Sequence, residues 1–320
     1  MIILMIVVAM FANTVILGFN STPSYGYSPC NCVIFVMDDM ADQGFHKVQL
    51  ATMNYFISKN MPFTASIIVS KIANSSNLQV FHKIEEGISK QLFEIAIHGY
   101  RHVNHSLLTK EEQVDDFREA KGKLEYLFGK RADIFIPPFN EFNLHTIEAM
   151  SDLNISLFST SPDKEQGTTN PYKSQTLVVT NNSKLEVSRI SDQKPLVYHA
   201  PFSVSFLRLA RNGLFGDDLV REALRLIDDS IAKHGFAQVR LHPSDFAQVN
   251  ATTTTGKFVN EVDNIESEEV NATTTTGKFV NEVDNIKFQH LTKTIDSLVD
   301  RNIKIASFDE IYPHSTTPSL

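Results

Sequence analysis

The chain has 320 residues, of which 42% are hydrophobic and 21% charged, an ordinary composition for a soluble globular protein. Its net charge of −8 and its pI near 5.8 argue against a nucleic-acid binder, which would normally carry a basic face. The length is compatible with one large α/β domain or with two small ones.

The first 19 residues contain no charged side chain, and the first charge of the chain is Asp38. Such a segment is long enough for a signal peptide or a membrane anchor, and the polar segment 20–29 follows it as a linker. We therefore expect an extracellular or cell-surface protein that contacts a membrane only through residues 1–19, if they are uncleaved. Glycosylation sequons agree with export; they begin at Asn20, Asn74, Asn104, Asn154, Asn181, Asn250 and Asn271.

The two cysteines of the chain, Cys30 and Cys32, are separated by one residue at the start of the first expected strand. A disulfide between them would close almost no loop and would therefore stabilise the fold little. Two cysteines also exclude a disulfide framework and a cysteine-rich metal site.

Strand patterns and helical patterns alternate along the chain. Strands are expected at 33–37, 63–69, 93–97, 134–137, 156–159, 196–199, 237–241 and 303–307, and helices at 46–59, 78–90, 110–127, 144–153, 217–234 and 288–301. The clearest helix, 110–127, carries acidic residues in its first half and ends before Gly129. This alternation predicts a parallel sheet that is closed, or nearly closed, into a barrel, with an irregular β insertion at 176–187.

One segment occurs twice. VNATTTTGKFVNEVDNI at 249–265 is repeated letter for letter at 270–286. Solenoid repeats come in threes or more and each carry an apolar face, whereas these are two identical copies in a Thr-rich context. We interpret them as a recent in-frame duplication within a surface loop. The alternative is a loop that was lengthened to cover an active-site mouth, since it follows closely on His242.

Candidate catalytic side chains follow three of the expected strands. Asp38 and Asp39 follow the first, His98 begins an HGYRH segment that ends at His102, and His242 follows AQVRL. Parallel strands gather their carboxyl ends at one face, where such folds place their active sites. Two histidines and one carboxylate suit a zinc-type ion. Neighbouring strand residues face opposite sides, so one aspartate can bind metal while the other takes a proton. The pattern predicts a metal-assisted hydrolase.

With these motifs the chain resembles the polysaccharide deacetylase family, metal-dependent carbohydrate esterases that include chitin, chitooligosaccharide and peptidoglycan deacetylases. VMDDM at 36–40, HGYRH at 98–102, IFIPPFN at 134–140 and VRLHP at 239–243 are similar to family motifs in order and spacing. The resemblance implies a distorted (β/α) barrel of about seven strands over residues 30–313, which includes the duplicated loop at 249–286 and is followed by a tail at 314–320.

The resemblance also implies an activity, the hydrolysis of an N-acetyl amide on a polysaccharide or oligosaccharide. In this family Asp39, His98 and His102 would bind a divalent metal, zinc in the first place, with Co, Ni, Mn or Fe as alternatives. Asp38 would be the general base, and His242 the general acid that protonates the leaving amine.

The third motif is expected to line the substrate groove through Pro138, Phe139, Asn140 and Asn143. His199 ends another expected strand and is a further candidate substrate contact, or else a histidine of the core. His105, three residues after His102, is expected near the metal motif but outside the ligand set.

Three features depart from the family pattern. Ile136 stands where the family carries an Arg that contacts the base aspartate, Gly99 replaces a Ser or Thr, and the chain has no Trp. The sequence thus leaves Asp38 without a charge partner, and Asn140 and Asn143 could supply neutral hydrogen bonds instead. Two alternatives therefore stay open: a glycan-binding surface protein without turnover, and an amidase that acts on non-glycan C–N bonds.

Overall fold

The structure is a computed structural model that describes residues 30–161, 197–259 and 269–311. The apolar segment 1–19, the linker 20–29, the β insertion expected at 176–187 and the tail 314–320 lie outside these ranges. Within the described ranges, no helix is long and apolar enough to cross a membrane.

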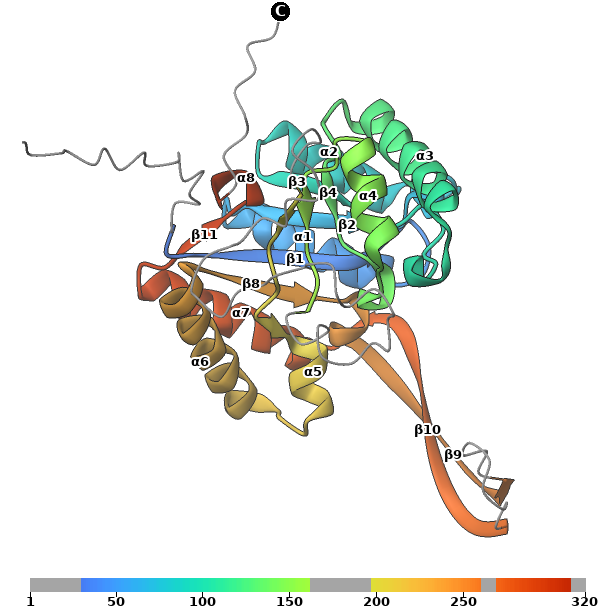
Figure 1. The fold of residues 1–320 in the computed structure, drawn as a ribbon. Helices are drawn as coiled ribbons and strands as arrows, with labels where there is room; N and C mark the ends of the chain where they lie inside the picture. The colour runs from blue at the N-terminus through green and yellow to red at the C-terminus, as the bar shows by residue number, and fades with distance from the viewer. Residues whose placement is uncertain (1–29, 162–196, 260–268, 312–320) are drawn as a thin grey trace, which may run out of the picture.

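The described chain alternates strands and helices as the sequence predicts (Figure 1). The strands of the main sheet are β1 (Cys32–Met40), β2 (Phe63–Ile67), β3 (Phe93–Ile97), β4 (Ile134–Phe135), β5 (Leu157–Phe158), β6 (Tyr198–His199), β7 (Val204–Ser205), β8 (Phe236–Leu241) and β11 (Lys304–Ala306). The helices are α1 (His46–Ser58), α2 (Gln79–Ser89), α3 (Lys110–Phe128), α4 (Leu144–Asp152), α5 (Phe206–Arg211), α6 (Gly216–His234), α7 (Asn285–Asp300) and α8 (Phe308–Ile311). The sequence pattern missed β7 and the two shortest helices, α5 and α8.

All strand pairs of the main sheet are parallel, in the order β6-β5-β4-β3-β2-β1-β8-β7, with β11 beside the start of β1. The two edge strands, β6 and β7, are joined by a short segment that bonds to both edges. Ala200 N donates to Phe158 O at 2.8 Å, and Ser203 N donates to Gln238 O at 2.9 Å. This segment brings the sheet edges together, and the distorted (β/α) barrel of about seven strands is confirmed.

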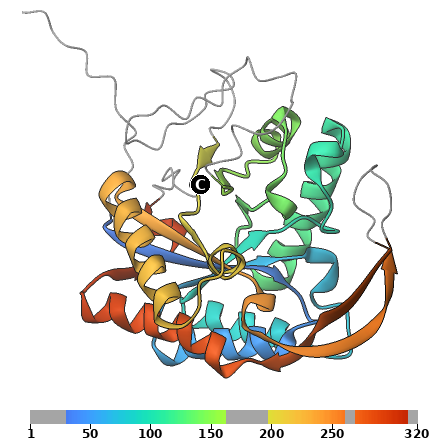
Figure 2. The ribbon, with the colours of Figure 1, turned by 90° about the horizontal axis from the view of Figure 1, so that it is seen from below.

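Side chains of the strands alternate between the barrel interior and the layer beneath the helices. On β1, Val33 and Phe35 belong to the large cluster that includes helix residues, whereas Ile34 and Val36 belong to a separate interior cluster. The alternation follows from the two-residue period of a strand. Figure 2 shows the helices on the outside of the sheet, with α6 beside α7 and α1 beside α2. The inward-facing residues therefore form the layer that lines the barrel interior.

Cys30 and Cys32, the two cysteines of the chain, form a disulfide with each other. Because it closes almost no loop, it stabilises the fold little.

Helix α3 can be compared with its predicted end. Helix α3 begins with a capping box between Thr109 and Glu112, and it ends at Gly129 in the left-handed conformation at φ 61°. The end of α3 that the sequence pattern predicts is thus confirmed.

The duplicated segment forms an antiparallel ribbon, where the sequence analysis expected a loop. Strands β9 (Ala247–Val259) and β10 (Glu269–Val283) pair so that ATTTTG of one copy lies antiparallel to ATTTTG of the other. Threonine is β-branched and favours strands, which explains the difference. The ribbon extends away from the barrel (Figure 1), and at its base Asn281 Oδ1 accepts a hydrogen bond from Lys47 N of α1 at 2.9 Å.

Candidate active site

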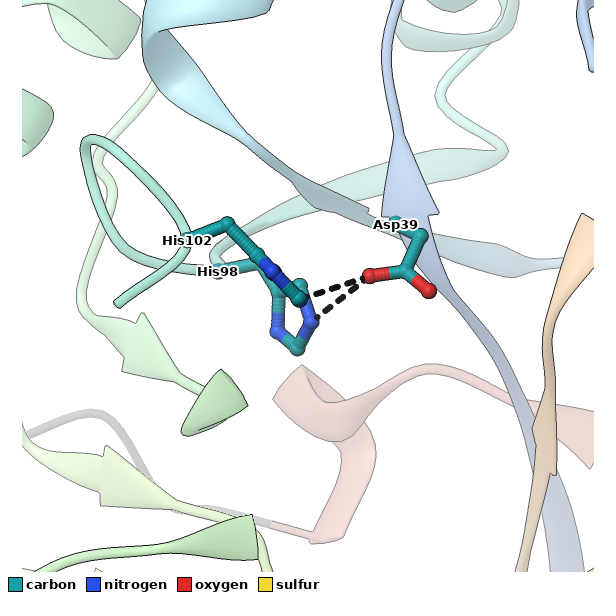
Figure 3. A group of neighbouring side chains, drawn as sticks. All are labelled: Asp39, His98 and His102. Carbon is teal, nitrogen blue, oxygen red and sulfur yellow. Dashed lines mark ion pairs between the residues drawn. The ribbon is translucent and has the colours of Figure 1, made fainter. Parts of the chain in front are cut away.

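The three expected metal ligands lie together at the carboxyl ends of β1 and β3, on either side of β2. Asp39 is at the end of β1, and His98 and His102 begin and end the loop after β3 (Figure 3). Asp39 Oδ1 is 3.2 Å from His98 Nε2 and 2.9 Å from His102 Nε2. The ligand atoms of the three residues all lie within 4.8 Å of one another. The structure therefore brings together the triad that the sequence predicts.

Left-handed backbone conformations turn these side chains toward each other. Asp39 has φ 59° and His102 has φ 56°, and the pairing of β1 with β2 shifts register between Met37 and Met40. Residues other than glycine rarely adopt such angles, which persist at functional sites where the surrounding structure enforces them. Because Asp39 leaves the regular strand here, its carboxylate departs from the alternation that governs the rest of β1.

The hydrogen bonding of His98 prepares it as a ligand. His98 Nδ1 lies 2.7 Å from the backbone oxygen of Ile136. A carbonyl oxygen can only accept, so Nδ1 carries a proton, and Nε2 is the nitrogen that would bind a metal. Two imidazole nitrogens and one carboxylate oxygen form a donor set that fits zinc and related divalent ions. The residues present therefore fit the metal that the family resemblance implies.

The charges of the triad reinforce each other. Burial opposes ionisation of Asp39, but the hydrogen bonds from His102 and His98 outweigh it and hold the pKa of Asp39 well below its usual range. Burial also acts against a charged His98, yet the carboxylates of Asp38 and Asp39 raise the pKa of His98 overall. Asp39 and His98 thus stabilise each other's charged forms.

The buried pair His105 and Asp116 packs against the HGYRH loop and supports it. His105 Nε2 lies 3.2 Å from Asp116 Oδ2 of α3, and the same oxygen accepts a hydrogen bond from Tyr100 N at 2.9 Å. His105 is thus a support of the loop and not part of the triad. A Cβ atom at Gly99, which has φ 72°, would lie 3.2 Å from His105 Cε1. This close approach explains glycine at the place where the family has Ser or Thr.

Asp38 has a charge partner that the sequence analysis did not find. Its Oδ2 lies 3.4 Å from Arg240 Nε and 3.9 Å from His242 Nε2. The expectation that Asp38 lacks a cationic partner is therefore wrong. The other oxygen, Oδ1, is buried and has no hydrogen-bond partner among the described residues. A signal existed in the sequence, because Arg240 falls on the same face of β8 as the interior residue Phe236.

His242 follows β8 and is half-buried beside Asp38. Burial lowers the pKa of His242, although Asp38 and Asp39 act in the opposite direction. His242 N donates to Asp245 Oδ2 at 2.8 Å. Burial also raises the pKa of Asp245 to about 8. Asp245 is a further site residue that sequence reasoning missed, three positions after the histidine.

Among the expected substrate contacts, Phe139 is the best placed. Its side chain is 58% exposed, and its ring centroid lies 4.7 Å from that of His102. Pro138 is buried behind it. Phe139 and Asn140 both have left-handed backbone, with φ 60° and 57°. The turn thus presents an aromatic surface beside the triad.

Asn140 and Asn143 make contacts that differ from those expected. Asn140 Oδ1 accepts a hydrogen bond from Arg240 Nη1 at 2.8 Å. Asn143 caps α4 by accepting from Thr146 N at 3.1 Å, and its Nδ2 donates to Ser106 O at 3.0 Å. Among the described contacts neither amide bonds to Asp38, because Arg240 lies there instead. The engaged side chain of Asn143 disfavours a substrate contact.

His199 lies on β6, with its ring centroid 5.4 Å from that of Phe158. Burial chiefly, and the charge of Arg240, lower the pKa of His199 to about 4, so the side chain is neutral at pH 7. Its Nε2 is buried and has no hydrogen-bond partner among the described residues. A substrate contact by His199 stays a prediction.

Part of the sequence matches a known protein family. A family model described as polysaccharide deacetylase matches residues 26–158, which hold the first three motifs. The resemblance to the polysaccharide deacetylase family is thus confirmed over residues 26–158. No curated protein matches the chain.

Solved structures share the fold of this chain at low identity. A putative polysaccharide deacetylase from Mycobacterium smegmatis is 14% identical, with a TM-score of 0.55, 92% of this chain and 96% of that chain covered. A peptidoglycan N-acetylglucosamine deacetylase is 12% identical, with a TM-score of 0.52 and coverages of 92% and 93%. A CE4 family pseudoenzyme from Bacillus anthracis is also 12% identical, with a TM-score of 0.51, 89% of this chain and 66% of that chain covered. At these identities the likeness concerns the fold alone.

Proposed function

We propose that the domain hydrolyses an N-acetyl amide on a polysaccharide or oligosaccharide and depends on a divalent metal, zinc in the first place. One observation carries the proposal: Asp39, His98 and His102 form a ligand triad, and Asp38 and His242 lie beside it. A ligand set next to a paired acid and base is an arrangement that supports metal-assisted amide hydrolysis.

Asp38 and His242 would each carry out one of the two proton transfers of the reaction. Asp38 has a free carboxylate oxygen, Oδ1, that can take a proton from the attacking water. His242, 3.9 Å from the other oxygen, can give a proton to the nitrogen of the leaving amine. An amine is a very poor leaving group unless it is protonated, so both functions are needed for amide cleavage. A divalent cation held by the triad would add Lewis acidity toward the amide carbonyl and toward water.

Two features favour turnover over a glycan-binding protein without activity. The ligand triad is complete, and Asp38 has a cationic partner in Arg240 despite Ile136 in the third motif. Phe139 supports a sugar substrate, because an exposed aromatic ring beside the triad can stack on a pyranose face.

The test is acetate release from N-acetylglucosamine oligomers by the purified full chain. The chain is assayed as purified, after chelation, and after zinc or cobalt is restored. Release that chelation abolishes and metal restores is the expected result. No release from a chain with one bound metal per protein would favour another amide substrate. No release and no bound metal would favour the glycan-binding alternative.

We also propose that the protein is exported and acts outside the cell or at its surface. The support is the uncharged segment 1–19 together with the sequons. Expression of the whole chain in a secreting host, followed by N-terminal sequencing and fractionation, tests the proposal. Recovery of the whole chain from the cytosol, with residues 1–19 uncleaved, would contradict it.

A further inference from the structure

Arg240 is a buried arginine inside the barrel, two residues before His242. Only 1% of its surface is exposed. The alternation along β8 directs it inward with Phe236 and Gln238, opposite to the face of β8 that packs beneath the helices. Burying a guanidinium group is costly unless its charge and its N–H groups find partners. The partners of Arg240 therefore indicate why an arginine occurs in a fully buried strand.

Each part of the guanidinium contacts a different element of the barrel. Nη1 donates to Asn140 Oδ1 at 2.8 Å, and Nη2 donates to Ser159 Oγ at 2.7 Å and to Ser159 O at 3.2 Å. The central carbon lies 4.3 Å from the ring centroid of Phe202. These contacts fix the planar group from three sides without the help of Asp38. Nε lies 3.4 Å from Asp38 Oδ2 as an ion pair, without a hydrogen bond between the two atoms.

We propose that Arg240 is the positioning residue of the general base, and that it holds the Asp38 carboxylate in its reactive orientation. The proposal rests on the proposed function and deepens it. Arg240 engages only Oδ2, so Oδ1 stays free of protein partners among the described residues and can face the attacking water. Arginine suits this task because its fork is rigid and its charge is permanent.

The third motif cannot provide the same contact. Ile136 is fully buried in the interior cluster, and its only polar contribution to the site is the backbone oxygen that bonds to His98. The structure therefore assigns the cation beside Asp38 to β8, the strand that also delivers His242. A single strand thus supplies both the general acid and the group that orients the base.

The test compares two substitutions on the same inward face of β8. Arg240→Met removes the guanidinium. Gln238→Met removes another buried polar side chain that contacts Ser159, through a 2.8 Å hydrogen bond, but not Asp38. For both variants kcat, KM, bound metal and a crystal structure are determined. The substrate is a set of N-acetylglucosamine oligomers.

For Arg240→Met we expect kcat to fall about 100-fold, because a base displaced by about 1 Å loses that much. KM and metal stoichiometry should stay within about threefold of wild type, since neither substrate binding nor the triad is altered. The crystal structure should show a displaced Asp38 carboxylate. Gln238→Met should keep kcat within about threefold. Arg240→Lys should recover part of the rate, because the ammonium keeps the charge but cannot hold Asn140, Ser159 and Asp38 together.

An unchanged kcat or an unmoved Asp38 in Arg240→Met would overturn the proposal, and so would an equal loss of kcat in Gln238→Met. If Arg240→Met does not fold, Asn140→Ala is used instead, since it removes one anchor of the guanidinium in a half-buried turn. There kcat should fall about tenfold, and no change in kcat would again overturn the proposal. An inactive wild-type chain would refute the proposed function itself, so the two failures are distinguishable.

Discussion

Asp38 and Asp39 are consecutive residues, but their carboxylates meet entirely different partners. Asp38 faces Arg240 and His242 in the barrel interior, whereas Asp39 faces the two histidines of the HGYRH loop. The left-handed backbone at Asp39, with φ 59°, separates the two directions. This division matches the two tasks that metal-assisted hydrolysis assigns to carboxylates, one as ligand and one as base.

Removing one imidazole should abolish metal binding. In His98→Ala, Asp39 and His102 remain but can no longer form a three-ligand set, so we expect bound zinc to fall below about a tenth of wild type and kcat/KM to fall about 1000-fold or more. Metal analysis after dialysis and acetate release check this. His82→Ala is the matched control, because the His82 side chain is 63% exposed on α2. A His98→Ala chain with full metal content would contradict the ligand assignment.

A serine at position 99 should damage the loop that carries the histidines. Gly99→Ser introduces left-handed strain of about 1–2 kcal/mol and a side chain 3.2 Å from His105 Cε1. Gly129→Ser is the control, since Gly129 has φ 61° but no atom within 4 Å of an added Cβ. Both variants should lower the free energy of unfolding, measured by urea denaturation, but only Gly99→Ser should weaken zinc binding. Equal zinc affinity in both would contradict the crowding argument.

The exposed ring of Phe139 should contribute to substrate binding more than to the chemical step. In Phe139→Ala the loss of a stacking surface worth about 1.4 kcal/mol should raise KM about tenfold and leave kcat within about threefold. Steady-state kinetics on N-acetylglucosamine oligomers provide the measurement. Tyr126→Ala removes an aromatic ring that is 87% exposed on α3, and its KM should stay at the wild-type value. A kcat loss without a change in KM would argue against the groove assignment.

Glu94 lies at the end of the barrel opposite to the triad, and it should make the stability of the fold depend on pH. Its carboxylate accepts hydrogen bonds from Phe308 N and Asp309 N at 2.9 Å each, at the start of α8. Burial chiefly, and then the charge of Asp309, raise the pKa of Glu94 from 4.5 to about 7. A carboxyl group with a raised pKa contributes stability that is present below its unfolded pKa and is lost as the pH rises through its folded pKa.

The variant Glu94→Gln cannot ionise, so it should lack this pH dependence. Between pH 4.5 and pH 8 the unfolding free energy of wild type should fall by about 2–3 kcal/mol relative to Glu94→Gln. Urea denaturation at both pH values gives the two differences. Glu222→Gln, on the exposed surface of α6, should show no such fall. A constant difference between wild type and Glu94→Gln would show that folding does not raise the pKa of Glu94.

The fold was largely predictable because most strands and helices carry a local pattern of apolar and polar residues. Strand β3 has the predicted bounds 93–97, and α3 ends at the predicted glycine. The ribbon was not predicted as strands, since its pairing comes from the match between two distant copies and not from an apolar face. The short strand β7 was missed for a similar reason, because two residues carry no periodic pattern.

The candidate site was predictable for those residues whose side-chain type and motif spacing already indicate a catalytic or metal-binding role. The triad, Asp38 and His242 all lie at strand ends, which a parallel barrel gathers at one face. Arg240 was missed because its importance depends on a cross-barrel contact that no local pattern shows. The helix cap at Asn143 was not foreseen, because an amide in a motif can cap a helix as readily as it can bind a substrate; its substrate contact stays a prediction.

The seam of the barrel has a consequence for the order in which the site can assemble. Arg240 bonds to Ser159 across the seam of the barrel, where the segment 200–203 joins the edge strands β6 and β7. The triad lies elsewhere, on β1 and the loop after β3. An opened seam would therefore leave Asp39, His98 and His102 together but remove the anchors of Arg240. Metal binding thus depends on β1 and β3, whereas the orientation of Asp38 depends also on the closed seam.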